Sequence, residues 1–212
     1  RGEHLKKIQK QGLTLEKMWD KTEENISIPA TDMEHYAEHP DVIFVCVKGY
    51  SLQETIPFIK RIARKNTIVI PVLNIYGTGG KMQKELPDLL VTDGCIYVSA
   101  NIKEPGKLLQ HGQILHIVFG VRDKAEFRPE LKEIQKDLCD SHIDGTLSEN
   151  IRREALEKFS YVSPIGAAGL YYHATAADFQ KEGEARELFK TMIKEIAALA
   201  EAMGVPFQKD MA

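Results

Sequence analysis

The chain has 212 residues, 43% of them hydrophobic, and a formal net charge of −3. This length and apolar content suffice for one large core or two smaller ones. The charge balance lacks the basic surplus that binding to nucleic acid or to an anionic membrane requires, and no apolar run approaches the ~18 residues of a membrane span. We therefore expect a protein that binds neither nucleic acid nor membrane.

The three cysteines are odd in number, far apart, and without metal-type spacing. Two of them fall in predicted strands, and the set comprises Cys46, Cys95 and Cys139. Buried free thiols in a reducing compartment are the expectation for such a set, as opposed to disulfides, and we expect a cytoplasmic protein. The histidines do not stand at metal-binding distances from acidic residues, so the sequence predicts no metal site.

The N-terminal part predicts a helix and two edge strands, followed by a strand of the core. Residues 3–10 have a helical pattern, and residues 13–19 and 26–30 are polar enough for the edge of a sheet. Residues 42–48 are apolar at six of seven positions and mostly β-branched, which is typical of a strand buried on both faces. Lys48 ends this run, either as a ligand group at the end of the strand or as a lysine that merely leaves the core for solvent.

A βαβ unit follows directly. Ser51 with Glu54 three residues later has the signature of a capping box, and apolar residues at helical spacing predict a helix over residues 52–63. Residues 67–73 are a second buried strand, which ends at Asn74. Units of this kind are parallel and right-handed in nearly all cases.

Lys48 and Asn74 therefore lie at the same edge of the predicted sheet. Neighbouring strands are only ~5 Å apart, and ligands of open parallel sheets bind beyond the carboxyl ends of the strands. The glycine-rich loop at residues 75–80 lacks the spacing of a Walker loop and predicts a flexible turn into a helix over residues 81–90.

The remaining elements change in character at residue 147. Before it we expect strands at residues 95–102 and 115–120, a turn with a short strand between them, a helix at 127–139 and an edge strand at 142–147. After it come only helical patterns, at residues 148–173 and 182–203. The prediction is an α/β, Rossmann-like parallel sheet domain over residues 1–147, incomplete at its N-terminus, and an all-α domain over residues 148–212, incomplete at its C-terminus.

Lys158 lies in a predicted helix that is crowded with small and aromatic residues. Partial desolvation would lower the pKa of its ammonium group and suit it to give a proton to a carbonyl oxygen. The alternative is a surface lysine paired with Glu154, one helical turn away. Pro164 interrupts the helical pattern and predicts a kink.

The order of these motifs resembles the ketopantoate reductase family (2-dehydropantoate 2-reductases and their relatives) over nearly the whole chain. The matching segments are DVIFVCVKGYSLQETI, TIVIPVLN, a PG turn followed by HG and a strand ending in FG, ENIRREALEKFSYVSP, and KEIAALAEAMGVPF. The resemblance implies a Rossmann domain that binds NADPH, a helical domain, and catalysis in the cleft between them. It also implies a small-molecule 2-keto acid substrate, and it allows a homodimer.

The resemblance assigns roles to four residues. Lys158 matches the family's catalytic lysine, which also contacts the substrate. Lys48 and Asn74 match a lysine and an asparagine that approach the ribose and nicotinamide, with Asn74 also near the substrate. Arg1 resembles the arginine that binds the 2′-phosphate of NADPH. A guanidinium suits this role because it can donate two parallel hydrogen bonds to a phosphate.

The sequence also departs from the family. No Gly-x-Gly-x-x-Gly motif is present, and the positions four and eight residues after the catalytic lysine, often asparagine in the family, are Val162 and Gly166. The leading hypothesis is an NADPH-dependent reductase of a 2-keto acid, in the manner of 2-dehydropantoate reduction for pantothenate biosynthesis. Two alternatives stay open: a non-catalytic nucleotide-binding module of the same fold, and a related hydroxyacid or opine-type dehydrogenase.

Overall fold

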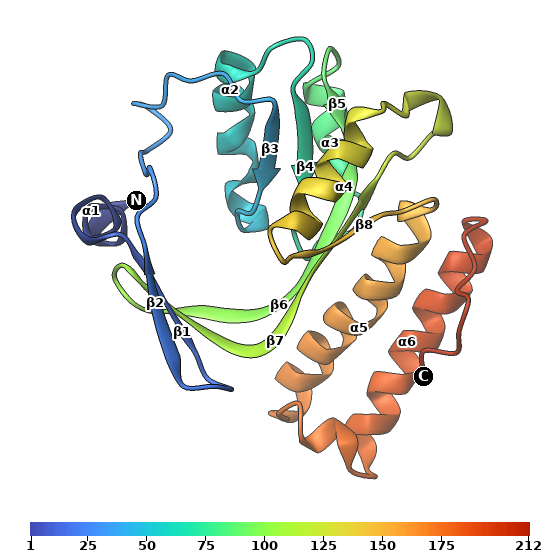
Figure 1. Ribbon diagram of the computed structural model, residues 1–212. Helices are drawn as coiled ribbons and strands as arrows, with labels where there is room; N and C mark the ends of the chain where they lie inside the picture. Colours follow the sequence, from blue (N-terminus) through green and yellow to red (C-terminus); the bar gives the residue numbers. More distant parts are fainter.

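The computed structural model describes all 212 residues. A parallel sheet with its covering helices forms one part of the molecule, and a long β-hairpin extends from it (Figure 1). Two antiparallel helices complete the chain. The predicted fold class is confirmed: a Rossmann-like region comes first and a helical region follows. None of the helices is long and apolar enough to cross a membrane.

The βαβ unit forms as predicted and builds a three-stranded parallel sheet. Its strands are β3 (Val42–Val45), β4 (Ile68–Pro71) and β5 (Leu90–Val91), in the order β3-β4-β5. Helix α2 (Leu52–Ile62) joins β3 to β4, and α3 (Thr78–Glu85) joins β4 to β5. Ser51 precedes α2 without a side-chain hydrogen bond, so the predicted capping box does not form. The chain instead enters the helix through a 3-10 turn, Gly49–Ser51.

Strand β3 differs from the prediction of a strand buried on both faces. It pairs only with β4, so it is an edge strand of this sheet, and Phe44 is 38% exposed. Every residue of β4, by contrast, is buried. The apolar run at residues 42–48 resembles that of a central strand in composition, but its unpaired edge leaves part of its surface open.

The second sheet is mixed. Its strands are β1 (Leu13–Lys17), β2 (Thr22–Ile26), β6 (Asp93–Glu104), β7 (Lys107–Gly120) and β8 (Asp144–Leu147), in the order β2-β1-β7-β6 with β8 also on β7. Strands β1 and β8 run parallel to β7, whereas β6 and β2 run antiparallel to their partners. The strand predicted at residues 26–30 lies instead at Thr22–Ile26.

One long hairpin replaces the separate strands predicted at residues 95–102 and 115–120. Strands β6 and β7 pair from Asp93↔Gly120 to Glu104↔Lys107, with shifts of register at two places. The turn at Pro105–Gly106 is the predicted one, but the residues after it continue β7. Gly106 has φ of +82°, a conformation that favours glycine in a tight turn.

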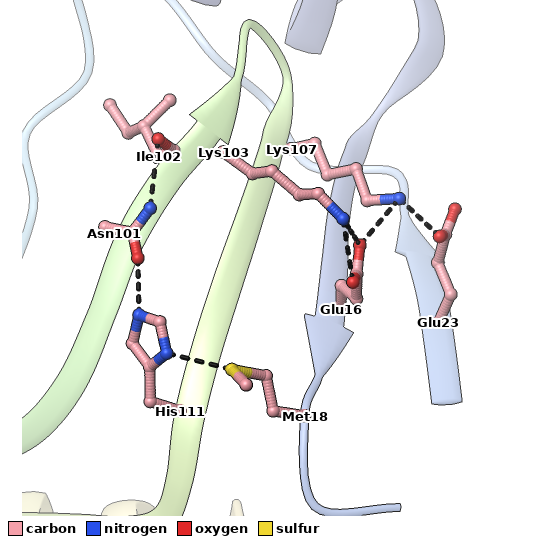
Figure 2. Close-up of polar contacts among 8 residues, drawn as sticks. All are labelled: Glu16, Met18, Glu23, Asn101, Ile102, Lys103, Lys107 and His111. Carbon is pink, nitrogen blue, oxygen red and sulfur yellow. Dashed lines mark hydrogen bonds and ion pairs between the residues drawn. The ribbon is translucent and has the colours of Figure 1, made fainter. Parts of the chain in front are cut away.

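Figure 2 shows the polar contacts that fasten β1 and β2 to this hairpin. Lys103 and Lys107 both contact the carboxylate of Glu16 on β1, at 2.7 and 3.0 Å, and Lys107 also contacts Glu23 on β2. On the same arm, His111 lies between Met18 and Asn101. We call Glu16, Glu23, Lys103 and Lys107 the arm network.

The core consists of apolar layers on the two faces of β4. One layer packs α2 and α3 against the sheet through Ile56, Ile59, Val69 and Met82. The other packs α4 (Glu130–Asp140) against β4 and β7 through Ile70, Phe119 and Leu131. Burial at about 25 cal/mol per Å² of apolar surface makes such layers the main stabilising contribution.

Two helices complete the chain after β8: α5 (Ile151–Tyr172) and α6 (Glu184–Ala202). They pack on each other through Leu156 and Ala200, and Ile151, fully buried with Cys95 and Val118, attaches the start of α5 to the hairpin. Pro164 lies inside α5 without ending the helix, and the kink predicted there stays a prediction. Every element after Leu147 is helical, while the division into two domains at that residue stays a prediction.

The remaining elements are α1 (Gly2–Gln11) and three short 3-10 turns: Gly49–Ser51, Lys124–Glu126 and Asp178–Gln180. Helix α1 precedes β1, and its His4 accepts a hydrogen bond from the backbone N–H of Gly106 at 3.0 Å. All three cysteines are free thiols, but only Cys95 is buried; Cys46 and Cys139 are exposed, contrary to the expectation of buried thiols.

Candidate active site

Lys158 is the one lysine that the fold buries, with 8% of its surface exposed. Its Nζ atom donates to Oδ1 of Asn74 at 2.9 Å and to the backbone carbonyl of Ile96. The side chain thus reaches from α5 to the end of β4 and to β6. Lys158 has no carboxylate within ion-pair distance, and Glu154 instead accepts a hydrogen bond from Ser148, so the alternative of a Lys158–Glu154 surface pair is wrong.

The surroundings of Lys158 disfavour its charge. Burial lowers the pKa of its ammonium below the ordinary value of 10.5, because the charged form loses its hydration. The ring of Tyr97 partly compensates, with its centroid 5.0 Å from Nζ. Burial also raises the pKa of the Cys95 thiol, to about 11, so Cys95 is a neutral neighbour at neutral pH.

Asn74 stands three residues beyond the carboxyl end of β4, where the sequence placed it, and its residue is exposed. The loop that carries it is pinned to α5 through the rings of Tyr76 and Phe159, whose centroids are 6.4 Å apart. The contact between Asn74 and Lys158 therefore joins the sheet region, which carries Asn74, to the helical region, which carries Lys158.

Lys48 also lies beyond the carboxyl end of its strand, three residues after β3, and it is exposed without an ion pair or side-chain hydrogen bond. Its loop runs beside that of Asn74: a Cβ atom added at Gly49 would lie 2.2 Å from Cδ1 of Ile75. The structure thus brings Lys48 next to the Asn74 loop but not into contact with Lys158.

Arg1 is exposed and precedes α1, on the far side of the β1–β2 strands from α5 (Figure 1). It makes no contact with Lys48, Asn74 or Lys158. The structure therefore gathers Lys158 and Asn74, places Lys48 at the same edge, and leaves Arg1 apart.

A cleft of about 590 Å³ opens beside the Lys158–Asn74 pair. Most of its wall is apolar or aromatic, and it lies between the hairpin and α5. The lining comprises Asn74, Ile96, Tyr97, Val98, Ser99, Gly112, Ile114, Glu157, Lys158, Tyr161, Val162 and Met211. Pockets for small molecules commonly have this size and a few convergent polar groups on an apolar wall.

The hairpin contributes cleft residues that sequence reasoning missed. Tyr97 and Val98 on β6 and Ile114 on β7 all face the cleft. Tyr97 stacks on His116, the residue directly opposite it, with ring centroids 5.4 Å apart. The sequence around Tyr97, Val98 and Ile114 indicates only strands. These residues can be assigned to the cleft only once the hairpin is known to be continuous and to lie beside α5.

The two positions at which the family often has asparagine differ in their surroundings. Val162 lines the cleft, one helical turn after Lys158. Gly166 is exposed, and a Cβ atom added there would meet no atom within 4 Å. The glycine-rich loop is structural: an added Cβ at Gly79 would lie 2.0 Å from the carbonyl oxygen of Thr92, so this glycine permits close packing of α3.

Two family models match the chain. The family model described as ketopantoate reductase PanE/ApbA matches residues 1–124, and the one for its C-terminal part matches residues 150–212. The 2-dehydropantoate 2-reductase of Aquifex aeolicus is 20% identical over 176 residues, which are 83% of this chain and 57% of that protein.

Solved structures share the fold at low identity. D-mandelate dehydrogenase in its ternary complex with NADH and anilino(oxo)acetate superposes with a TM-score of 0.85 at 17% identity, over 98% of this chain and 66% of that one. A PanE/ApbA family ketopantoate reductase from Ralstonia eutropha JMP134 gives 0.84 at 18% identity, over 99% and 67%. The chain thus spans between about half and two thirds of the length of the relatives that it matches.

Proposed function

Because the chain belongs to the ketopantoate reductase family, we propose that the protein reduces the ketone group of a 2-keto acid to an alcohol with NADPH. The observation that carries the proposal is the partly buried contact between Lys158 Nζ and Asn74 Oδ1, at 2.9 Å, on the wall of a cleft of ligand size. It joins an ionisable group from the helical region to the edge of the sheet where ligands of such folds bind.

The chain's own residues fit the nicotinamide end of such a cofactor. Strands β3 and β4 are parallel neighbours, and the loops at their carboxyl ends present Lys48 and Asn74 to solvent. Residues 1–212 contain no Gly-x-Gly-x-x-Gly motif, so Lys48 and Asn74 are the groups here that would hold the cofactor's ribose and nicotinamide. The cofactor would supply a hydride for the carbonyl carbon.

Lys158 has the properties of the proton donor. Its ammonium is buried, and its lowered pKa makes loss of the proton easier than from a lysine in water. As the carbonyl carbon accepts a hydride, the oxygen gains negative charge and takes the proton from Nζ, which leaves a neutral amine and an alcohol product. Asn74, whose Oδ1 already accepts from Nζ, fixes the ammonium's position and leaves its amide nitrogen for the substrate.

The choice of NADPH over NADH is part of the proposal and rests on Arg1. A guanidinium pairs bidentately with a phosphate, and Arg1 is exposed and carries no ion pair. Cytoplasmic location, a homodimer and a role in pantothenate synthesis stay predictions of the same proposal.

The lining of the cleft favours a second candidate, reduction of a 2-keto acid with a bulky apolar substituent. Val98, Ile114, Tyr161 and Val162 form an apolar wall next to Lys158, where an asparagine at position 162 would bind hydroxyl groups of a substrate. The related fold of D-mandelate dehydrogenase, solved with NADH and anilino(oxo)acetate, is consistent with this candidate.

The test is steady-state reduction of ketopantoate, phenylglyoxylate and pyruvate by the purified protein, with NADPH and with NADH. We expect turnover with at least one 2-keto acid and a higher kcat/KM with NADPH. Preference for phenylglyoxylate would favour the second candidate. Binding of NADPH without turnover of any member of a broad 2-keto acid panel would contradict the proposal and favour a non-catalytic nucleotide-binding module.

A variant at the cleft sharpens the choice of substrate. Val162→Asn supplies the amide that many family members have there, so its kcat/KM should rise for ketopantoate and fall for phenylglyoxylate, each by ~10-fold, about the discrimination that a few contacts provide. Gly166→Asn is the matched control, since that position lies in open space. Equal changes for both substrates would mean that residue 162 does not select the substituent.

A further inference from the structure

A second cavity, of about 840 Å³, lies where the ends of β7 and β8 and helix α4 meet the start of α5. It shares no lining residue with the cleft at Lys158. Its wall comprises Val121, Arg122, Lys124, Phe127, Lys132, Gln135, Leu147, Ser148, Glu149, Asn150, Ile151, Arg152 and Val205. Figure 1 shows these elements at the end of α5 that adjoins β8, away from the outer end of the hairpin.

The charge of this cavity is opposite to that of the protein. Four cationic residues and one acidic residue, Glu149, line it, although the whole chain carries a net charge of −3. Arg122 has a carboxylate neighbour, since its Nη1 lies 3.6 Å from Oδ1 of Asp93. Lys124, Lys132 and Arg152 have none within ion-pair distance. Unpaired like charges around a concave surface create a positive potential there, which favours an anion.

The backbone adds donors to the same wall. The side chain of Asn150 caps the N–H of Arg153, at 3.2 Å, while the N–H groups of Ile151 and Arg152 have no acceptor in the protein. They form the positive end of the 22-residue helix α5. These N–H groups alone would bind water. Together with the three unpaired cationic side chains, they give the cavity wall several hydrogen-bond donors that an anion can use.

The cavity also has an apolar side. Phe127 is 43% exposed, and Nζ of Lys132 lies 5.8 Å from the centroid of its ring. Leu147, Val121 and Val205 continue this side. A ligand that matches both sides carries at least two negative charges at one end and an apolar or planar group at the other, and the volume is that of ordinary small-molecule sites.

We propose that this cavity binds a phosphorylated small molecule, at a site separate from the Lys158 cleft. The phosphate would contact Lys124, Lys132 and Arg152, and the remainder of the ligand would pack on Phe127. A phosphate suits these groups better than a single carboxylate because it offers more acceptor oxygens and up to two charges.

Inorganic pyrophosphate is the probe for this site. Calorimetric titration of the protein, with NADPH present in excess so that a cofactor site is blocked, should show binding. The double variant Lys132→Gln/Arg152→Gln should weaken it by at least ~10-fold, because each substitution removes a charge-assisted hydrogen bond to the anion. Lys136→Gln is the matched control on α4: that lysine pairs with Asp140 at 3.2 Å and does not line the cavity, so its affinity should equal the wild type.

Two measurements keep the result interpretable. Both substituted side chains are exposed, so the double variant should keep the wild-type melting temperature. Amide chemical shifts should move on addition of pyrophosphate at residues 149–152 and not at Lys158. Absence of binding, equal weakening by the control, or displacement of pyrophosphate by NADPH would overturn the proposal.

Discussion

Two lysines in different regions of this protein show opposite responses to their surroundings. Lys158 in the cleft is buried, contacts only neutral oxygens and a ring, and has a lowered pKa. Lys107 in the arm network contacts the carboxylates of Glu16 and Glu23, and these hydrogen bonds raise its pKa (Figure 2). The same side chain is thus prepared to release a proton in one region and to keep it in the other.

Under the proposed function, the difference separates the charges that this fold uses for structure from the one that it uses for chemistry. In the arm network each ammonium has a carboxylate partner in contact with water, an arrangement that fixes strand register at little net gain in stability. In the cleft a charge without a carboxylate partner is held by an amide oxygen and a carbonyl, which costs stability and is retained where reactivity is needed.

Removing the cleft lysine should have the largest effect. Lys158→Met should lower turnover by ~100-fold or more, the usual contribution of a general acid, and leave NADPH affinity almost unchanged. The melting temperature should change little, because relief of a buried charge offsets the loss of two hydrogen bonds. Kinetics, cofactor titration and thermal melts measure the three quantities. Lys194→Met, at an exposed position of α6, is the control, and turnover equal to wild type in Lys158→Met would exclude the assigned role.

Giving the cleft lysine a carboxylate partner should make it resemble Lys107. Asn74→Asp places an anion about where Oδ1 now accepts from Nζ, so the pKa of Lys158 should rise. The alkaline limb of kcat/KM should then move to higher pH, and KM for a 2-keto acid should increase by at least ~10-fold through repulsion of its carboxylate. Asn74→Ala removes the amide without adding charge, so an alkaline shift in both variants would contradict this explanation.

The fold was predictable where local pattern and packing agree. The βαβ unit, the helices at residues 52–63 and 127–139, and the change to helices after residue 147 all follow from periodicity. The continuous hairpin did not, because residues 103–114 are polar and carry no hydrophobic alternation. They are held as strand by pairing with β1 and by ion pairs distant in sequence, such as Lys103 with Glu16.

The candidate site was predictable in part for a similar reason. Parallel strands bring their carboxyl ends to one edge, which placed Asn74 and Lys48. Burial of Lys158 depends on how α5 packs on the hairpin. The apolar periodicity of this helix alone is equally compatible with a surface lysine at position 158. Tyr97 and Ile114 enter the cleft only through the hairpin, so no local signal identified them.

The pH dependence of the wild type tests the lowered pKa directly. Lys158 gives its proton only when charged, so kcat/KM should fall as pH rises through its pKa, with a midpoint below the ordinary 10.5. Cys95 and Tyr97 beside it have raised pKa values and stay neutral through this range, so they should not produce the limb. Rates at pH values from neutral to strongly alkaline, in buffers of constant ionic strength, measure it. A rate that is constant up to pH 10.5, or loss of the limb in Cys95→Ala or Tyr97→Phe, would contradict the assignment.

The smallest effect is expected in the arm network. Glu16→Gln removes the carboxylate that Lys103 and Lys107 share, but these groups are solvated, so the melting temperature should fall by only a few degrees at most. Hydrogen bonds from the two lysines lower the pKa of Glu16 below its ordinary 4.5. Its stabilisation is therefore present above that value and is lost as pH falls through the folded-state pKa. The difference in melting temperature between wild type and Glu16→Gln should accordingly shrink at acidic pH and in high salt, whereas turnover near neutral pH should not change.

Glu3→Gln, which breaks an exposed pair with Lys6 on α1, is the matched control for loss of an acidic charge. A loss of activity in Glu16→Gln comparable to that of Lys158→Met would show that the arm is part of the catalytic machinery and not only its support.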